Sequence, residues 1–144
     1  MPNYRIHILF YFAVVILFIA AVNLLEMHLE VNVLIYSISF GLLYSLLPDI
    51  DARRSVIRST FVKILSLTAI ISFILFIIYQ DLLQFILLLL SLCLLISLNF
   101  LKHRGIFHNL YLAIVLSIPP YFIDPLVCVF AFIGYFSHLV MDAI

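Results

Sequence analysis

The 144-residue sequence is poor in the residues that a water-soluble protein needs at its surface. Charged residues make up 10% of the chain, against about 25% in an ordinary soluble domain. A globule of this size must cover a large surface with polar side chains, and they are too few in this chain. The composition therefore excludes a soluble globular protein. It also excludes an intrinsically disordered chain, because such chains are polar and weakly hydrophobic.

Other scarcities remove further classes of function. The chain has three glycines, and none belongs to a glycine-rich phosphate-binding loop. Seven basic residues are balanced by seven acidic ones, so no basic surplus points to a nucleic-acid partner. The two cysteines, Cys93 and Cys128, lie inside long apolar runs. We expect each to pack within a helix as a small hydrophobic side chain.

What the chain does contain is hydrophobic sequence, at 67% of its residues and a mean hydropathy of +1.35. Six apolar runs are expected to be long enough to cross a bilayer as helices, which takes about 20 residues. Because these runs are apolar on all faces, they predict helices rather than the alternating strands of a membrane barrel. We predict an all-α, polytopic membrane protein with a single domain over residues 1–144, whose spans cover residues 7–25, 31–47, 61–79, 82–100, 108–120 and 125–144.

The basic residues give this six-span bundle an orientation. All seven lie on one side of the predicted membrane, namely Arg5, Arg53, Arg54, Arg58, Lys63, Lys102 and Arg104. The positive-inside rule then places both termini in the cytoplasm, in a multi-pass protein of the cytoplasmic (inner) membrane. The third and fourth spans are separated only by Gln80 and Asp81, which predicts a tight antiparallel hairpin.

Residues able to bind a metal ion gather at the same cytoplasmic ends of the spans. They are His7, Asp49, Asp51, His103, His108, His138 and Asp142. His138 and Asp142 are four residues apart, so they share one face of the last helix. A carboxylate near a helix centre costs about 2.5–3.5 kcal/mol on insertion scales, and such residues usually face the bundle interior with a partner. A purely structural His–Asp hydrogen bond is the alternative interpretation of this pair.

Two loops would complete the site. Pro48 is expected to end the second helix and leave Asp49 and Asp51 in an extended or irregular segment with access to water. In an extended chain, both carboxylates would point the same way. In the other loop, Gly105 allows a sharp turn that brings His103 and His108 together. Asn109 is expected to cap the helix that follows.

Together the seven residues offer four imidazoles and three carboxylates. This donor set suits zinc, iron, manganese or nickel better than a metal that prefers thiolates. It exceeds the four ligands of one tetrahedral zinc. The sequence therefore predicts one or two divalent metals per chain, with zinc as the first choice and manganese or iron as alternatives.

The motifs also arrive in an order that resembles a known family. LeuProAspIleAsp at 47–51, HisArgGlyIlePheHis at 103–108 and GlyTyrPheSerHisLeuValMetAsp at 134–142 resemble the YdjM-like family, and His7 fits its N-terminal pattern. The chain departs from that pattern where Ala52 replaces a histidine. The resemblance implies an inner-membrane-associated, LexA-binding and metal-dependent hydrolase.

We therefore expect an enzyme whose metal polarises a phosphoryl or acyl oxygen and activates water. A substrate that enters from the bilayer would be a lipid or a lipid-linked phosphate. Asp49 would take part both in metal binding and in general-base catalysis. The guanidinium of Arg104 would hold a phosphate. The alternatives are a metal-stapled structural subunit and an ion-pathway protein. The sequence leaves the oligomeric state open.

Overall fold

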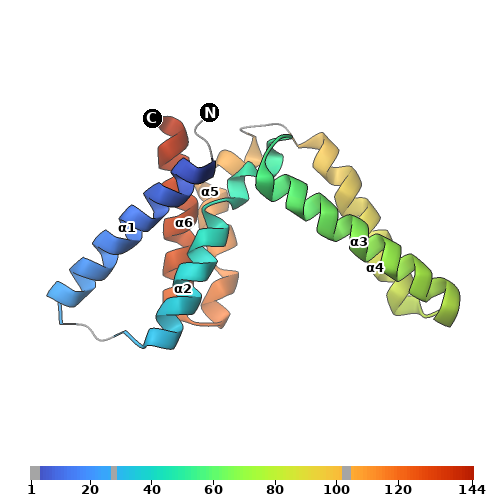
Figure 1. Ribbon diagram of the computed structural model, residues 1–144, viewed down its shortest axis with the longest axis horizontal. Helices are drawn as coiled ribbons and strands as arrows, with labels where there is room; N and C mark the ends of the chain where they lie inside the picture. Colours follow the sequence, from blue (N-terminus) through green and yellow to red (C-terminus); the bar gives the residue numbers. More distant parts are fainter. Residues whose placement is uncertain (1–3, 27–28, 102–104) are drawn as a thin grey trace. The chain divides into compact units, whose positions relative to one another are not determined.

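The computed structural model describes residues 4–26, 29–101 and 105–144, which form helices joined by short turns (Figure 1). The described residues form six α-helices, namely α1 (Tyr4–Leu24), α2 (Val31–Tyr44), α3 (Val56–Tyr79), α4 (Leu82–Ser97), α5 (Leu110–Ser117) and α6 (Pro125–Ala143). Four 3-10 segments join or extend them, namely η1 (Leu47–Asp51), η2 (Leu98–Phe100), η3 (Ile106–His108) and η4 (Pro119–Phe122). The prediction of an all-α fold is confirmed.

Five of the helical segments are long and apolar enough to cross a membrane: α1, α2 with η1, α3, α4 with η2, and α6. The remaining apolar segment, Leu110–Phe122, is shorter than the roughly 20 residues of a crossing. It differs from the full span expected at residues 108–120 because of Pro119 and Pro120. Each proline lacks a backbone N–H, so α5 ends at Ser117 and continues as the 3-10 turn η4.

The chain forms two compact units. The first contains Met1–Pro48 and Ile106–Ile144, and so holds α1, α2, α5 and α6. The second contains Asp49–Gly105, and so holds the α3–α4 pair.

In the first unit, α6 packs against α1, α2 and α5. The N-terminal end of α1 and the C-terminal end of α6 lie at the same end of this unit (Figure 1). Its apolar core is built on the buried residues Tyr11, Val15 and Phe130. The hydroxyl of Tyr11 donates a hydrogen bond to the carbonyl oxygen of Ile38 at 2.9 Å, which ties α1 to α2. The first helix, α1, therefore packs against both α2 and α6.

Two glycines allow α2 and α6 to cross with their backbones in contact. A Cβ atom on Gly134 would clash with the backbone of Gly41, and one on Gly41 would clash with the Tyr11 hydroxyl. In a membrane, where lipid tails are as apolar as the side chains, close approach through small residues is a main source of helix association. The crossing brings the C-terminal end of α2 against α6 near His138.

The second unit contains the predicted helical hairpin, which is confirmed. α3 ends at Tyr79, and the left-handed backbone of the next residue, Gln80 (φ 51°), caps the helix and lets the chain reverse into α4. α3 begins at Val56, earlier than the apolar run, because the Ser55 hydroxyl caps it by accepting from the Arg58 N–H at 3.1 Å. Cys93, which was expected to pack inside, is exposed on α4. The reason is that α4 packs mainly against a single neighbour, α3.

Candidate metal centre

The last helix supplies two buried polar side chains one turn apart. His138 is fully buried, and the side chain of Asp142 is 6% exposed. The distance from His138 Nε2 to Asp142 Oδ2 is 3.6 Å. The prediction that this pair shares a helix face is confirmed.

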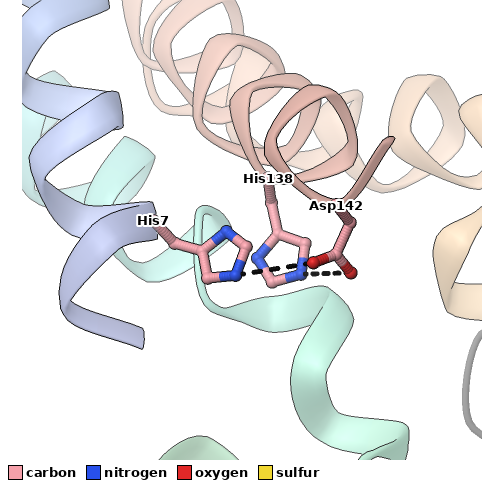
Figure 2. A group of neighbouring side chains, drawn as sticks. All are labelled: His7, His138 and Asp142. Atoms are coloured by element: carbon pink, nitrogen blue, oxygen red, sulfur yellow. Dashed lines mark ion pairs between the residues drawn. The ribbon is translucent and has the colours of Figure 1, made fainter. Parts of the chain in front are cut away.

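The first helix brings His7 to the same carboxylate. Its Nε2 lies 3.6 Å from Asp142 Oδ1, and the residue is 2% exposed. The imidazole rings of His7 and His138 stack with their centroids 3.9 Å apart and an angle of 11° between their planes. Figure 2 shows the two rings side by side, with the carboxylate across from their Nε2 atoms.

His108, at the end of η3, approaches the other oxygen of the carboxylate. Its Nε2 lies 3.0 Å from Asp142 Oδ2, within hydrogen-bonding distance. α5 starts directly afterwards, because the Asn109 side chain accepts from the Tyr111 N–H at 2.9 Å. That cap was predicted from the sequence and is confirmed. Asp142 is thus bordered by three histidines that come from α1, η3 and α6.

The backbone of α2 orients the His138 ring. His138 Nδ1 lies 2.7 Å from the carbonyl oxygen of Ser45. A carbonyl oxygen only accepts, so Nδ1 is the nitrogen that carries the proton. The Nε2 lone pair is then directed to the side where His7 and Asp142 lie, as in proteins whose metal-binding histidines are oriented by a backbone carbonyl.

The three side chains His7, His138 and Asp142 fit the needs of a metal ion. One ligand atom from each lies within 4.8 Å of the others. Around a tetrahedral zinc with bonds of about 2.0–2.1 Å, neighbouring ligand atoms stand about 3.3 Å apart. The two nitrogen–oxygen distances of 3.6 Å, from His7 to Oδ1 and from His138 to Oδ2 of Asp142, are each close to that spacing. Two imidazoles with one carboxylate hold catalytic zinc and non-haem iron in other proteins.

Asp49 and Asp51 belong to the second unit, and one expectation about them is wrong. They do not lie in an extended segment but in the 3-10 helix η1, where Pro48 is the second residue and its missing N–H is tolerated. With about three residues per turn, side chains two positions apart point roughly 120° away from each other. Neither carboxylate is well exposed to water, since the residues are 8% and 1% exposed.

Both aspartates have partners inside their own unit. The Asp49 carbonyl accepts from the Ser55 hydroxyl at 2.6 Å, and the Asp51 side chain accepts from the Gly105 N–H at 3.4 Å. Their part in a metal site stays a prediction. His103 and Arg104, predicted as a ligand and as a phosphate-binding group, lie outside the described residues.

Two hydrogen bonds around the cluster were not predicted from the sequence. One involves the Ser45 carbonyl, which as a backbone group has no residue-type signature. The other involves Tyr135, fully buried on α6, whose hydroxyl donates to the Phe107 carbonyl at 2.7 Å. Tyr135 lies three residues before His138, so a hydroxyl on the polar face of an otherwise apolar helix was the available indication.

The fold and this cluster define a polytopic α-helical membrane protein with a buried group of histidine and aspartate side chains that can hold a metal ion. The model of the YdjM inner membrane protein family matches residues 1–144, the whole chain, and the chain belongs to that family. It is therefore a multi-pass inner membrane protein, as predicted. Comparison with curated proteins and with solved structures gives no match.

Proposed function

We propose that the protein is a membrane-bound, metal-dependent hydrolase, which acts at the cytoplasmic face on a lipid or a lipid-linked phosphate. The observation that carries the proposal is the meeting of His7, His138 and Asp142. The three side chains are buried in a membrane helix bundle, where isolated polar groups are costly. Intramembrane ionisable residues of this kind usually mark a functional site.

In this proposal, His7 and His138 would bind the metal through Nε2, and Asp142 would bind it through a carboxylate oxygen. His108 would hold the second oxygen of Asp142, as hydrogen-bond partners of ligating carboxylates do in other metal sites. A divalent ion in this place, zinc first and manganese or iron as alternatives, would supply Lewis-acid polarisation and an activated water. The predicted roles of Asp49 as proton acceptor and Arg104 as phosphate-binding group complete the proposal.

The size of the ligand group favours catalysis. Structural zinc sites take four protein ligands, whereas catalytic sites take three and leave a position for water or substrate. In this assignment His7, His138 and Asp142 would be the three ligands, and His108 would contact Asp142 rather than the ion. The lipid substrate class is inferred from location, because a site built on membrane helices receives its substrates most directly from the bilayer.

A structural staple is the second candidate, and a specific observation favours it. The cluster joins α1, η3 and α6, so a metal there would hold the two ends of the chain together. An ion pathway, the third candidate, would need polar groups directed into a continuous path, and the buried serines do not support it. The hydroxyls of Ser37, Ser91 and Ser117 each donate to a carbonyl of their own helix at 2.7 Å.

The test combines metal analysis with turnover on protein purified in detergent. Wild type and His7→Ala would be compared with Ser91→Ala, a buried polar residue of α4. The substrates would be a lipid phosphate monoester, a phospholipid and a soluble phosphoester. We expect a stoichiometric metal and lipid hydrolysis in wild type and Ser91→Ala, and neither in His7→Ala.

The outcomes separate the candidates. A stoichiometric metal without hydrolysis of any of these substrates would favour the staple. Hydrolysis of the soluble phosphoester alone would contradict the lipid substrate class. Protein that binds no added zinc, manganese or iron would contradict the metal centre itself.

A further inference from the structure

Tyr135 is a buried residue on α6 that connects two parts of the metal centre. Its side chain is fully buried, and its hydroxyl donates to the Phe107 carbonyl oxygen at 2.7 Å. Phe107 directly precedes His108 in the short helix η3. The hydroxyl therefore holds the chain one residue away from the imidazole that reaches Asp142.

The two residues that contact η3, Tyr135 and Asp142, lie on the same helix. Tyr135 and Asp142 are seven residues apart, about two turns or 10.5 Å along α6. η3 lies against α6 through the Tyr135 hydroxyl bond at one point and through the His108–Asp142 contact of 3.0 Å at another. A rigid helix thus sets the spacing between the imidazole and the carboxylate.

We propose that Tyr135 is a positioning residue of the metal centre, which acts by holding His108 against Asp142 Oδ2. His108 is the nearest of the three imidazoles to Oδ2, at 3.0 Å, and His138 Nε2 lies 3.6 Å from that same oxygen. Oδ1 remains on the side of His7, 3.6 Å from its Nε2. The Tyr135 hydroxyl would thereby fix which oxygen ligates the metal. This inference rests on the proposed metal site and extends it to a residue that would not touch the ion.

The test is the affinity of Tyr135→Phe for Zn²⁺ and Co²⁺, measured by competition with a chelator in detergent. The matched control is Tyr44→Phe. Its hydroxyl makes the same kind of bond, to the Leu116 carbonyl at 2.8 Å, and that bond anchors α5, which follows η3. Loss of a hydrogen-bond partner behind a metal ligand typically weakens affinity about 10–100-fold. We expect that loss for His108→Ala, a smaller but measurable loss for Tyr135→Phe, and unchanged affinity for Tyr44→Phe.

A double-mutant cycle with His108→Ala tests whether Tyr135 acts on metal binding through His108. If Tyr135 acts through His108, Tyr135→Phe has no further effect on metal affinity once the imidazole is gone. The Co²⁺ absorption spectrum gives a second readout, because a change in ligand geometry shifts its visible bands. A purely structural role would lower the thermal unfolding temperature while leaving this spectrum unchanged.

Each outcome of these measurements either supports or overturns the inference. Equal Zn²⁺ affinity in wild type and Tyr135→Phe overturns the inference while leaving the metal site intact. An equal loss in Tyr44→Phe also overturns it, since the effect would then come from loosening α5 and η3 as a whole. A further loss in the His108→Ala background shows that Tyr135 does not act through His108. Wild-type protein that binds neither ion overturns the proposed function together with this inference.

Discussion

The spans that contain α6 and α4 differ little in sequence character and greatly in environment. Each has 19 residues, and their mean hydropathies are 1.8 and 2.4. Yet 39% of the α6 span is buried, against 11% of the α4 span. A modest difference in polarity therefore accompanies a large difference in packing.

The residues that α6 buries explain the difference. Small and polar side chains lie on its interior face, including Gly134, Ser137 and His138. α4 buries Ser91, which is satisfied by the carbonyl of Leu87 in its own helix. Lipid tails compete equally for apolar side chains, so close backbone contact and interhelical hydrogen bonds decide which helix is enclosed. The comparison teaches that α6 is enclosed through its small and polar residues and not through a higher hydropathy.

The largest expected effect comes from removing a metal ligand in α6. His138→Ala should lose both the bound metal and the activity, because the ion would be left with one imidazole and one carboxylate. Ser91→Ala, the corresponding change at a buried polar residue of α4, should keep the full metal content. Metal analysis beside turnover for the two proteins checks this. A His138→Ala protein that keeps its metal would show that the site lies elsewhere.

Asp49→Asn tests whether function is confined to the first unit. The sequence predicts Asp49 as a general base, and a positioned base contributes about 10²–10⁴-fold in rate. The amide keeps the shape of the side chain but cannot accept the proton, so we expect activity to fall by that factor while most of the metal is retained. Asp51→Asn is the neighbouring comparison and, as a predicted ligand, should lower the metal content instead. Full activity in Asp49→Asn would remove the second unit from the chemistry.

Much of the fold follows from local properties of the sequence. Apolar run length predicted five of the six spans, and the two-residue linker at 80–81 predicted the hairpin. Helical periodicity placed His138 and Asp142 on one face of the last helix. His7 and His108 were predicted as metal ligands because they lie at the same predicted ends of the spans. These predictions depend on residue type and spacing, which the sequence states directly.

The features that the sequence did not reveal depend on backbone geometry. The carbonyl oxygens of Ser45 and Phe107 accept the bonds that orient His138 and Tyr135, and every residue has such an oxygen. The conformation after Leu47 depended on how the chain packs, because proline fits both an extended segment and the first turn of a 3-10 helix. The early start of α3 came from the Ser55 cap, which preceded the apolar run that marked the helix.

A smaller effect is expected where α6 meets α2. Gly134→Ala would place a methyl group against the Gly41 backbone, and such overpacking typically costs about 1–3 kcal/mol. Cys93→Leu is the matched enlargement on α4, where the side chain is exposed and lipid can yield. Unfolding titrations in mixed micelles should show destabilisation in the first variant and little change in the second. Similar stabilities would contradict the close crossing.

The smallest effect concerns Arg58, the buried cation of α3. Its Nη2 donates to the Leu98 carbonyl at 2.6 Å and its Nη1 to the Asp51 carbonyl at 3.3 Å, so one guanidinium caps the ends of α4 and η1. Arg58→Lys keeps the charge but replaces a planar fork with a single ammonium group. Loss of one of the two bonds should lower the free energy of unfolding by about 1.5 kcal/mol, the lower end for bonds to charged groups.

Arg54→Lys, at an exposed residue of the turn that precedes α3, is the control and should leave stability unchanged. Hydrogen exchange of the last turn of α4 would localise the effect of Arg58→Lys, because the Leu98 carbonyl belongs to that end of the helix. Metal affinity should stay at the wild-type value in both variants, since the guanidinium serves backbone groups of the second unit. If Arg58→Lys weakened metal binding as much as a change in α6 does, the contrast between α6, which carries proposed metal ligands, and the α3–α4 hairpin, which carries none, would fail.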